Sequence, residues 1–180
     1  DSARIVVCHV PCAVVGTIAY IVSAAYAIGY LVRRNMPNDI KSAAAASLGF
    51  LFTVLATVTG MVFAGVEWGT AWNWDPRETS ILMLLIVYAA YFALRSALPN
   101  AVSRAKISAA YNILAGVTMP FFVFVMPRIG PASLHPSRAS LSPEYRLVMG
   151  AATLGFLMLY VWVFRLAVRV REVEAARRRK

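Results

Sequence analysis

The sequence predicts an all-α membrane protein that crosses the bilayer five times. Of its 180 residues, 60% are hydrophobic and only 14% are charged, and the mean hydropathy is +0.66. The apolar residues form runs of the length that a transmembrane helix needs, about 20 residues. None of these runs alternates apolar and polar residues as the strands of a membrane barrel do. We therefore expect residues 1–180 to form a single integral membrane domain, a polytopic helical bundle.

Five apolar runs define the expected spans. In chain order they cover roughly Val10–Val32, Ala43–Val66, Ser80–Leu94, Ile107–Met126 and Tyr145–Leu166. The third run is the shortest, and its first turn is expected to lie in the interfacial layer of the membrane.

Residues that start or distort helices mark the limits of these spans. The run Asp75-Pro76-Arg77-Glu78 predicts an N-cap Asp, a Pro in the first helical position and a Glu that completes a capping box. Ser142-Pro143-Glu144 predicts a similar start for the fifth span. Pro11 is expected in the first turn of the first span, with His9 just outside the helix. Pro120 should kink the fourth span in its outer half.

The basic residues predict the orientation of the chain. Most of the 18 Lys and Arg residues fall in the first and third connections and at the C-terminal end. They are Arg33, Arg34, Lys41, Arg95, Arg104, Lys106, Arg165, Arg169, Arg171, Arg177, Arg178, Arg179 and Lys180. The positive-inside rule puts these residues in the cytoplasm. The N-terminus, the Trp-rich segment 67–80 and the loop 127–142 are then expected outside. The net charge of +10 thus marks membrane flanks and does not indicate a nucleic-acid-binding protein.

Three tryptophans are concentrated between the second and third spans. Trp68, Trp72 and Trp74 lie within seven residues, directly before Asp75. An interfacial aromatic belt explains one or two such residues. The density favours a flat aromatic platform for a large planar ligand, with the belt as the alternative. Trp68 and Trp72 share a face if the segment is helical, and Trp74 joins them only if the chain turns before Asp75.

The only two histidines, His9 and His135, are both expected on the outer side. Two imidazoles on opposite sides of an iron porphyrin give a six-coordinate haem, in which the axial ligands are the protein's main control over the iron. A zinc site is the weaker alternative, because it needs three or four ligands and Cys8 is the third candidate. Cys8 and Cys12 flank His9 at helical spacing and are most simply small apolar residues.

Outer arginines are candidates for binding the carboxylates of such a ligand. Arg77, Arg128 and Arg138 are the candidate propionate partners, because a guanidinium binds a carboxylate through two hydrogen bonds. Arg128 has the stronger case, since it follows the fourth span directly and shares a loop with His135. The simpler interpretation of each arginine alone is a solvated loop charge. The sequence holds no nucleophile–base pair and no phosphate-binding loop, so no enzymatic activity is expected.

These motifs resemble the WWD-domain haem-handling proteins of cytochrome c maturation, the haem exporter protein C and CcsA group. The resemblance rests on Trp68–Ser80, on His9-Val10-Pro11 and on Ser133-Leu134-His135, in the family's order over nearly the whole chain. It implies a haem b site on the outer face of the bacterial inner membrane. His9 and His135 would be the axial ligands, and the three tryptophans and Asp75 would shape the platform.

The resemblance also implies partners. Members of this group pass haem to a periplasmic haem chaperone and work with ABC transporter ATPase and permease subunits. Two departures stand out: Ala71 replaces a frequent Trp, and the family usually has six spans, including one before the His-Val-Pro motif. Two alternatives stay open. One is a CcsA-type haem lyase, which attaches haem to apocytochrome c, and the other is a membrane scaffold or permease subunit without haem.

Overall fold

The computed structural model describes residues 2–129 and 142–177, and it confirms the predicted fold class. Five long helices make up the bundle: α1 (Ser2–Arg33), α2 (Met36–Trp68), α3 (Pro76–Ala97), α4 (Ala101–Pro120) and α6 (Pro143–Arg177). The π-helical turn η1 (Phe121–Val125) and the short α5 (Met126–Ile129) extend α4. All five long segments, with α4 continuing to Ile129, are long and apolar enough to cross a membrane.

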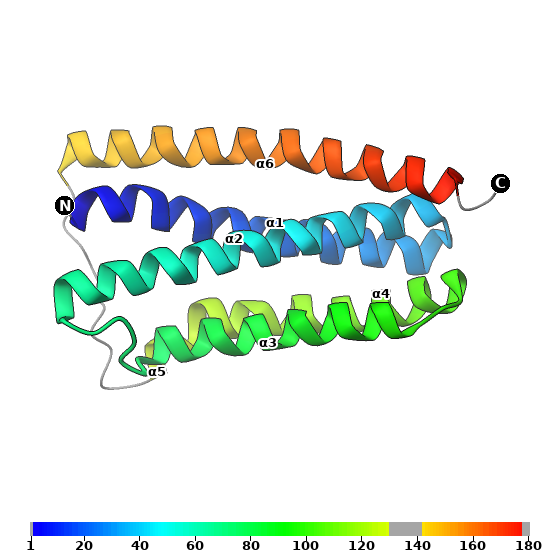
Figure 1. Cartoon of the computed structure of the whole chain (residues 1–180), viewed down its shortest axis with the longest axis horizontal. Coiled ribbons are helices and arrows are strands. Elements are labelled where there is room, and N and C mark those ends of the chain that lie inside the picture. The colour runs from blue at the N-terminus through cyan, green and yellow to red at the C-terminus, as the bar shows by residue number, and fades with distance from the viewer. Residues whose placement is uncertain (1, 130–141, 178–180) are drawn as a thin grey trace.

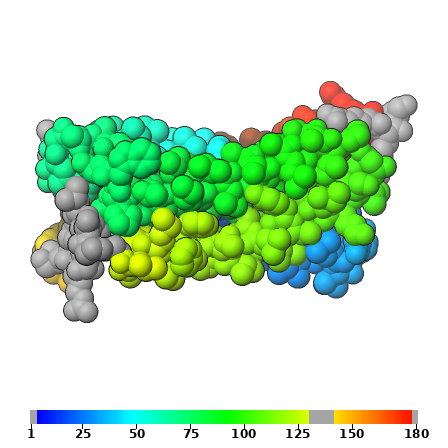
Figure 2. Space-filling model, turned by 90° about the horizontal axis from the view of Figure 1, so that it is seen from below, coloured from blue at the N-terminus to red at the C-terminus, as the bar shows by residue number. Residues whose placement is uncertain are grey.

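The helices run up and down along one common direction (Figure 1). One end of the bundle carries the start of α1, the α2–α3 connection and α5. The other end carries the α1–α2 and α3–α4 turns and the end of α6. The α1–α2 pair is the most extensive helix packing, with α6 on one side of it and α3 and α4 on the other. Figure 2 shows α3 and α4 covering one long face of the molecule. The described parts of the regions predicted to lie outside the membrane, namely the start of α1, the α2–α3 connection and α5, therefore share one end of the bundle.

Four of the five long helices are longer than the spans predicted from apolar residues, whereas α4 reaches the predicted end at Met126 only through η1 and α5. At the N-terminus the greater length corrects one expectation. α1 begins at Ser2, so His9 and Pro11 both lie inside the helix, not before it and in its first turn. The reason is that residues 3–10 are themselves mostly apolar, and a membrane-embedded backbone satisfies its polar groups best as a helix. Pro11 only removes the N–H that would have bonded the carbonyl of Val7, and transmembrane helices tolerate that loss.

Small residues let the central helices approach closely. Ala43, Ala44, Ala45 and Ala46 of α2 are almost fully buried, as expected where small side chains bring membrane helices together. A Cβ atom on Gly49 would lie 2.7 Å from the Tyr20 ring, so only glycine leaves room for that ring. Tyr20 in turn stacks on Tyr88 of α3, with 3.7 Å between the ring centroids. The α1–α2–α3 packing thus depends on a glycine and an aromatic pair.

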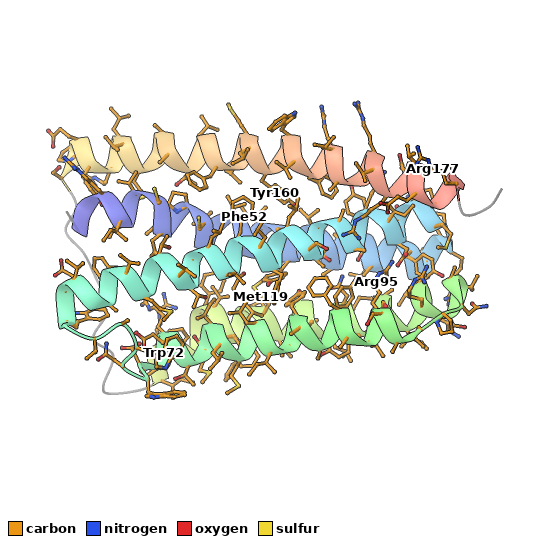
Figure 3. The ribbon with its side chains drawn as sticks, viewed as in Figure 1. Phe52, Trp72, Arg95, Met119, Tyr160 and Arg177 are labelled. Atoms are coloured by element: carbon orange, nitrogen blue, oxygen red, sulfur yellow. The ribbon has the colours of Figure 1, made fainter. Side chains whose placement is uncertain are left out.

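Two further contacts join the outer helices to this centre. In Figure 3, Phe52 and Tyr160 meet between α2 and α6, and Met119 lies between α2 and the α3–α4 pair. The Phe52 and Tyr160 rings are 6.5 Å apart in an edge-to-face arrangement. Met119 is buried in the cluster that contains Tyr20 and Tyr88. These contacts fix both flanks of the α1–α2 pair.

A buried ion pair closes the bundle at the end opposite to the Trp-rich segment. Arg95 of α3 donates two hydrogen bonds to Asp39 of α2, at 2.7 and 2.6 Å. The side chains are only 17% and 5% exposed. Such a bidentate pair fixes the orientation of both partners. It ties the first turn of α2 to the last turn of α3.

Pro120 ends the regular part of the fourth span. The helix changes type there, because the π-helical η1 follows Pro120 directly and leads into α5. We expected a proline kink at this position, and the structure shows a π-helical turn. Short π-helical segments within membrane helices redirect the side chains that follow them and are frequent at functional sites.

Candidate functional site

A cavity of about 460 Å³ lies at the end of the bundle that carries the Trp-rich segment. α1 and α2, the start of α3, and η1 with α5 form its walls. Most of its lining is apolar, and the residues are His9, Val10, Ala13, Val14, Thr17, Ile18, Ala56, Thr57, Gly60, Met61, Trp72, Arg77, Glu78, Ser80, Ile81, Phe122, Val123, Phe124, Pro127 and Arg128. An apolar cavity of this size with a few convergent polar groups is typical of a site for a small organic ligand or cofactor.

His9 contributes the imidazole of this cavity and is oriented by α2. Its Nδ1 lies 2.9 Å from the carbonyl oxygen of Ala56 and 3.2 Å from Oγ1 of Thr59. A carbonyl oxygen only accepts hydrogen bonds, so Nδ1 carries the proton and donates it. The lone pair of the neutral ring is then on Nε2. Histidines that bind metals usually donate their other ring N–H to a carbonyl or carboxylate in this way. The surroundings of His9 therefore suit a metal ligand.

The connection between α2 and α3 is held by local hydrogen bonds. Gly69 ends α2 in the left-handed conformation, with φ of 77°. Asp75 caps α3 by accepting a hydrogen bond from the backbone N–H of Arg77 at 2.8 Å, and the predicted capping box is confirmed. The Glu78 carboxylate accepts from the backbone N–H groups of Asn73, at 2.8 Å, and Asp75, at 3.3 Å. Glu78 thus fixes the segment that carries Trp72 as well as the helix start.

The three tryptophans occupy different positions. Trp72 lines the cavity, and Figure 3 places it at this end of the bundle. Trp74 lies edge to face against Trp72 at 5.7 Å, has φ of 55° and is 69% exposed. Trp68, the last residue of α2, packs edge to face on Phe63 at 5.7 Å. Because α2 ends at Trp68, the helical condition under which Trp68 and Trp72 would share a face is not met. Only Trp72 of the three belongs to the cavity lining.

Two guanidinium groups converge on the same cavity. Arg77 lies in the first turn of α3 and Arg128 lies in α5, and both line it. They are close enough to interact electrostatically, and Arg77 also interacts with the Asp75 carboxylate. Arg128 donates through Nη1 to the carbonyl of Phe124, which anchors the side chain to η1. The pair places positive charge beside an apolar volume, which suits an apolar ligand that carries carboxylates.

Sequence reasoning missed several parts of the site. The π-helical turn brings Phe122, Val123 and Phe124 to the lining, and Gly60 lies against His9 on the α2 wall. Pro120 was the only signal for the π-helical turn. A single glycine in an apolar helix gave no signal for the role of Gly60, since its importance comes from a residue 51 positions away.

His135 and residues 130–141 lie outside the described part of the chain, so the second expected ligand has no described position. Within the described residues, no group of three or more His, Cys, Asp and Glu side chains is placed to hold a metal ion. The structure brings together His9, Trp72, Arg77 and Arg128 in one cavity lining, whereas Asp75 is not in the lining and caps α3. It places Trp68 and Trp74 outside the lining.

Together, these features define a polytopic helical membrane protein with an apolar cavity at one end of its bundle. The profile of the haem exporter protein C family, "Heme exporter protein C", matches residues 1–180. The chain belongs to this family, and the resemblance inferred from its motifs is confirmed.

Proteins that are similar to this chain bear the name of the family. The chain is 30% identical over 173 residues to "Heme exporter protein C" of Bradyrhizobium diazoefficiens, covering 93% of this chain and 66% of the relative. It is 28% identical over 185 residues to that of Paracoccus denitrificans, covering 99% and 75%. For Escherichia coli K12 it is 31% identical over 163 residues, covering 88% and 66%. The chain thus spans between about two thirds and three quarters of the length of these relatives.

Proposed function

We propose that this chain is an integral protein of the bacterial inner membrane that holds haem b at the outer face and hands it on for cytochrome c maturation. One observation carries the proposal. The His9 imidazole, oriented by the Ala56 carbonyl, lines the same apolar cavity as Trp72, Arg77 and Arg128. Family membership supports it, since the relatives are named for haem export.

The cavity lining matches the parts of a haem molecule. Apolar side chains from α1, α2, α3, η1 and α5 would surround the macrocycle, and Trp72 would lie against its face or edge. Arg77 and Arg128 would pair with the propionates. His9 would supply an axial nitrogen, and bound haem would supply the iron that this nitrogen ligates. Each residue acts by holding or orienting, which fits delivery of a cargo.

We further propose His135 as the second axial ligand. The segment that contains it connects α5 to α6, and α5 and the start of α6 both lie at the cavity end of the bundle. The basic residues at the opposite end support a cytoplasmic location for that end, which leaves the cavity facing the periplasm. Transfer of haem to a periplasmic chaperone, with ABC transporter ATPase and permease subunits as partners, completes the proposal.

The test is to replace His9 and His135 separately by Ala and to measure copurified haem and cytochrome c yield in cells. Both should fall in each variant while membrane insertion is unchanged. Arg146, at the start of α6 and absent from the cavity lining, provides a matched control as Arg146→Gln. Unchanged haem content in the His9 variant would contradict the proposal and favour a scaffold or permease subunit. Copurification of apocytochrome peptides, with no chaperone or ABC subunits, would favour a haem lyase.

A further inference from the structure

Gly60 of α2 lies directly against the imidazole of His9. A Cβ atom at this position would stand 3.0 Å from Cε1, 3.4 Å from Nδ1 and 4.0 Å from Nε2 of the ring. The shortest of these distances is tighter than ordinary van der Waals contact, so with a methyl group at this position the ring would have to shift by a few tenths of an ångström. Gly60 also lines the cavity itself. The closeness of the ring to α2 therefore depends on glycine at this position.

The same turn of α2 supplies the hydrogen-bond acceptors for His9. The Thr59 hydroxyl donates to the carbonyl of Leu55 at 2.7 Å, so its oxygen is available to accept from Nδ1 of His9. Ala56 supplies its carbonyl at 2.9 Å. Both acceptors lie within four residues of Gly60. Displacement of the ring by a side chain at residue 60 would lengthen both hydrogen bonds.

We propose that Gly60 and Thr59 are positioning residues for His9 as a haem ligand. They set which ring nitrogen carries the proton and where the ring lies relative to α2. The inference rests on the proposed haem-binding function and adds to it. The hydrogen bond to Nδ1 keeps the lone pair on Nε2 and raises the basicity of the ligand. The absence of a side chain at residue 60 allows this hydrogen bond to form.

The first test compares Gly60→Ala with Gly65→Ala. Gly65 lies on the same helix with no heavy atom within 4 Å of a Cβ, so its substitution controls for helix effects. Alanine favours a helix interior over glycine, so neither change should destabilise α2. Titration of the purified protein with haemin should show affinity lowered by about 10- to 100-fold in Gly60→Ala, the usual effect of losing an outer-shell partner. Gly65→Ala should bind like the wild type.

Metal-free protoporphyrin IX separates positioning from simple blocking of the cavity. This probe has the macrocycle and carboxylates of haem but no iron for His9 to bind. Gly60→Ala should bind it with the same affinity as the wild type. An equal loss of affinity for haemin and for the metal-free probe would show that the new methyl group only obstructs the cavity, and would overturn the proposal.

A second pair of variants tests the hydrogen bond without adding volume next to the ring. Thr59→Val keeps the shape of the side chain but loses the accepting oxygen, whereas Thr59→Ser keeps the oxygen. Thr59→Val should lower haemin affinity and weaken the low-spin Soret and α bands, and Thr59→Ser should restore both. Wild-type spectra and affinities in both Gly60→Ala and Thr59→Val, with binding lost in His9→Ala, would overturn the inference but leave the proposed function intact. If the wild type itself binds no haemin, the proposed function fails.

Discussion

The Nδ1 atom of His9 lies 2.9 Å from the carbonyl oxygen of Ala56, across the α1–α2 interface. This contact lies within the most extensive helix packing of the bundle, between α1, which carries the first motif, and α2. It explains how a histidine on an N-terminal helix acquires a fixed ring orientation. It also means that the site depends on α2, although α2 contributes no titratable side chain to the cavity lining.

The arginine pair provides the first prediction. Replacing Arg77 or Arg128 by Gln should lower haem affinity roughly 10- to 100-fold each, because a hydrogen bond to a charged group contributes about 1.5–3 kcal/mol. Haemin titration measures the effect. The control ligand is haem dimethyl ester, which has the same macrocycle and iron but no free carboxylates. Both variants should bind the ester as the wild type does. An equal loss for the acid and the ester would argue against propionate binding.

The tryptophans are expected to differ in importance. Trp72→Ala should weaken haem binding most, since Trp72 alone of the three lines the cavity. Trp74→Ala should have a smaller effect, because Trp74 is 69% exposed and only supports Trp72 from the side. Trp68→Ala should leave haem affinity nearly unchanged, since Trp68 packs on Phe63. Haem titration of the three variants side by side gives the order, and an equal loss in all three would instead indicate a single platform.

Asp75 should matter through the structure of the segment before α3. Asp75→Ala removes an N-cap, which costs about 0.5–2 kcal/mol, and loosens the turn that carries Trp72. Thermal unfolding in detergent should show a lower midpoint, and haem affinity should fall with it. Asp75→Ser retains a capping oxygen and should recover most of both. If Asp75→Ser behaved like Asp75→Ala, a direct role of the carboxylate would be the better explanation.

Variants of the Asp39–Arg95 ion pair, at the end opposite to the cavity, should change the stability of the protein without changing its haem binding. Asp39→Asn leaves the buried Arg95 guanidinium without its countercharge, and breaking such a pair costs about 3–5 kcal/mol. The unfolding midpoint should fall clearly, while the protein that remains folded should keep its haem spectrum. The double variant Asp39→Leu with Arg95→Met should recover much of the stability. Loss of haem binding in this folded double variant would show that the two ends of the bundle are coupled.

Much of the fold was predictable because it follows from local patterns. The five spans could be predicted from the length of the apolar runs, because the thickness of a bilayer sets the length of a transmembrane helix. The capping box could be predicted from the four residues Asp75-Pro76-Arg77-Glu78 alone. The helix limits were less accurate. Apolar residues identify the membrane-embedded part of a helix, and α2 and α6 continue beyond it.

The site was only partly predictable, because it depends on contacts between helices. His9, Trp72, Arg77 and Arg128 were identified by residue type and expected side of the membrane, and all four line the cavity. The π-helical turn at Phe121–Val125 was signalled only by Pro120, which predicted a kink, and the contact of Gly60 with His9 depends on how α1 and α2 pack. No periodicity or motif in a single helix encodes such a relation. His135 lies outside the described residues, and its role stays a prediction.

The most direct test of the central claim is the visible absorption spectrum of the purified wild-type protein in mild detergent, recorded beside His9→Ala and His135→Ala. Axial ligation by two histidines predicts a low-spin Soret band with resolved α and β bands in the reduced wild type, and weaker bands in each variant. A colourless wild-type protein that also fails to take up added haemin would contradict the account.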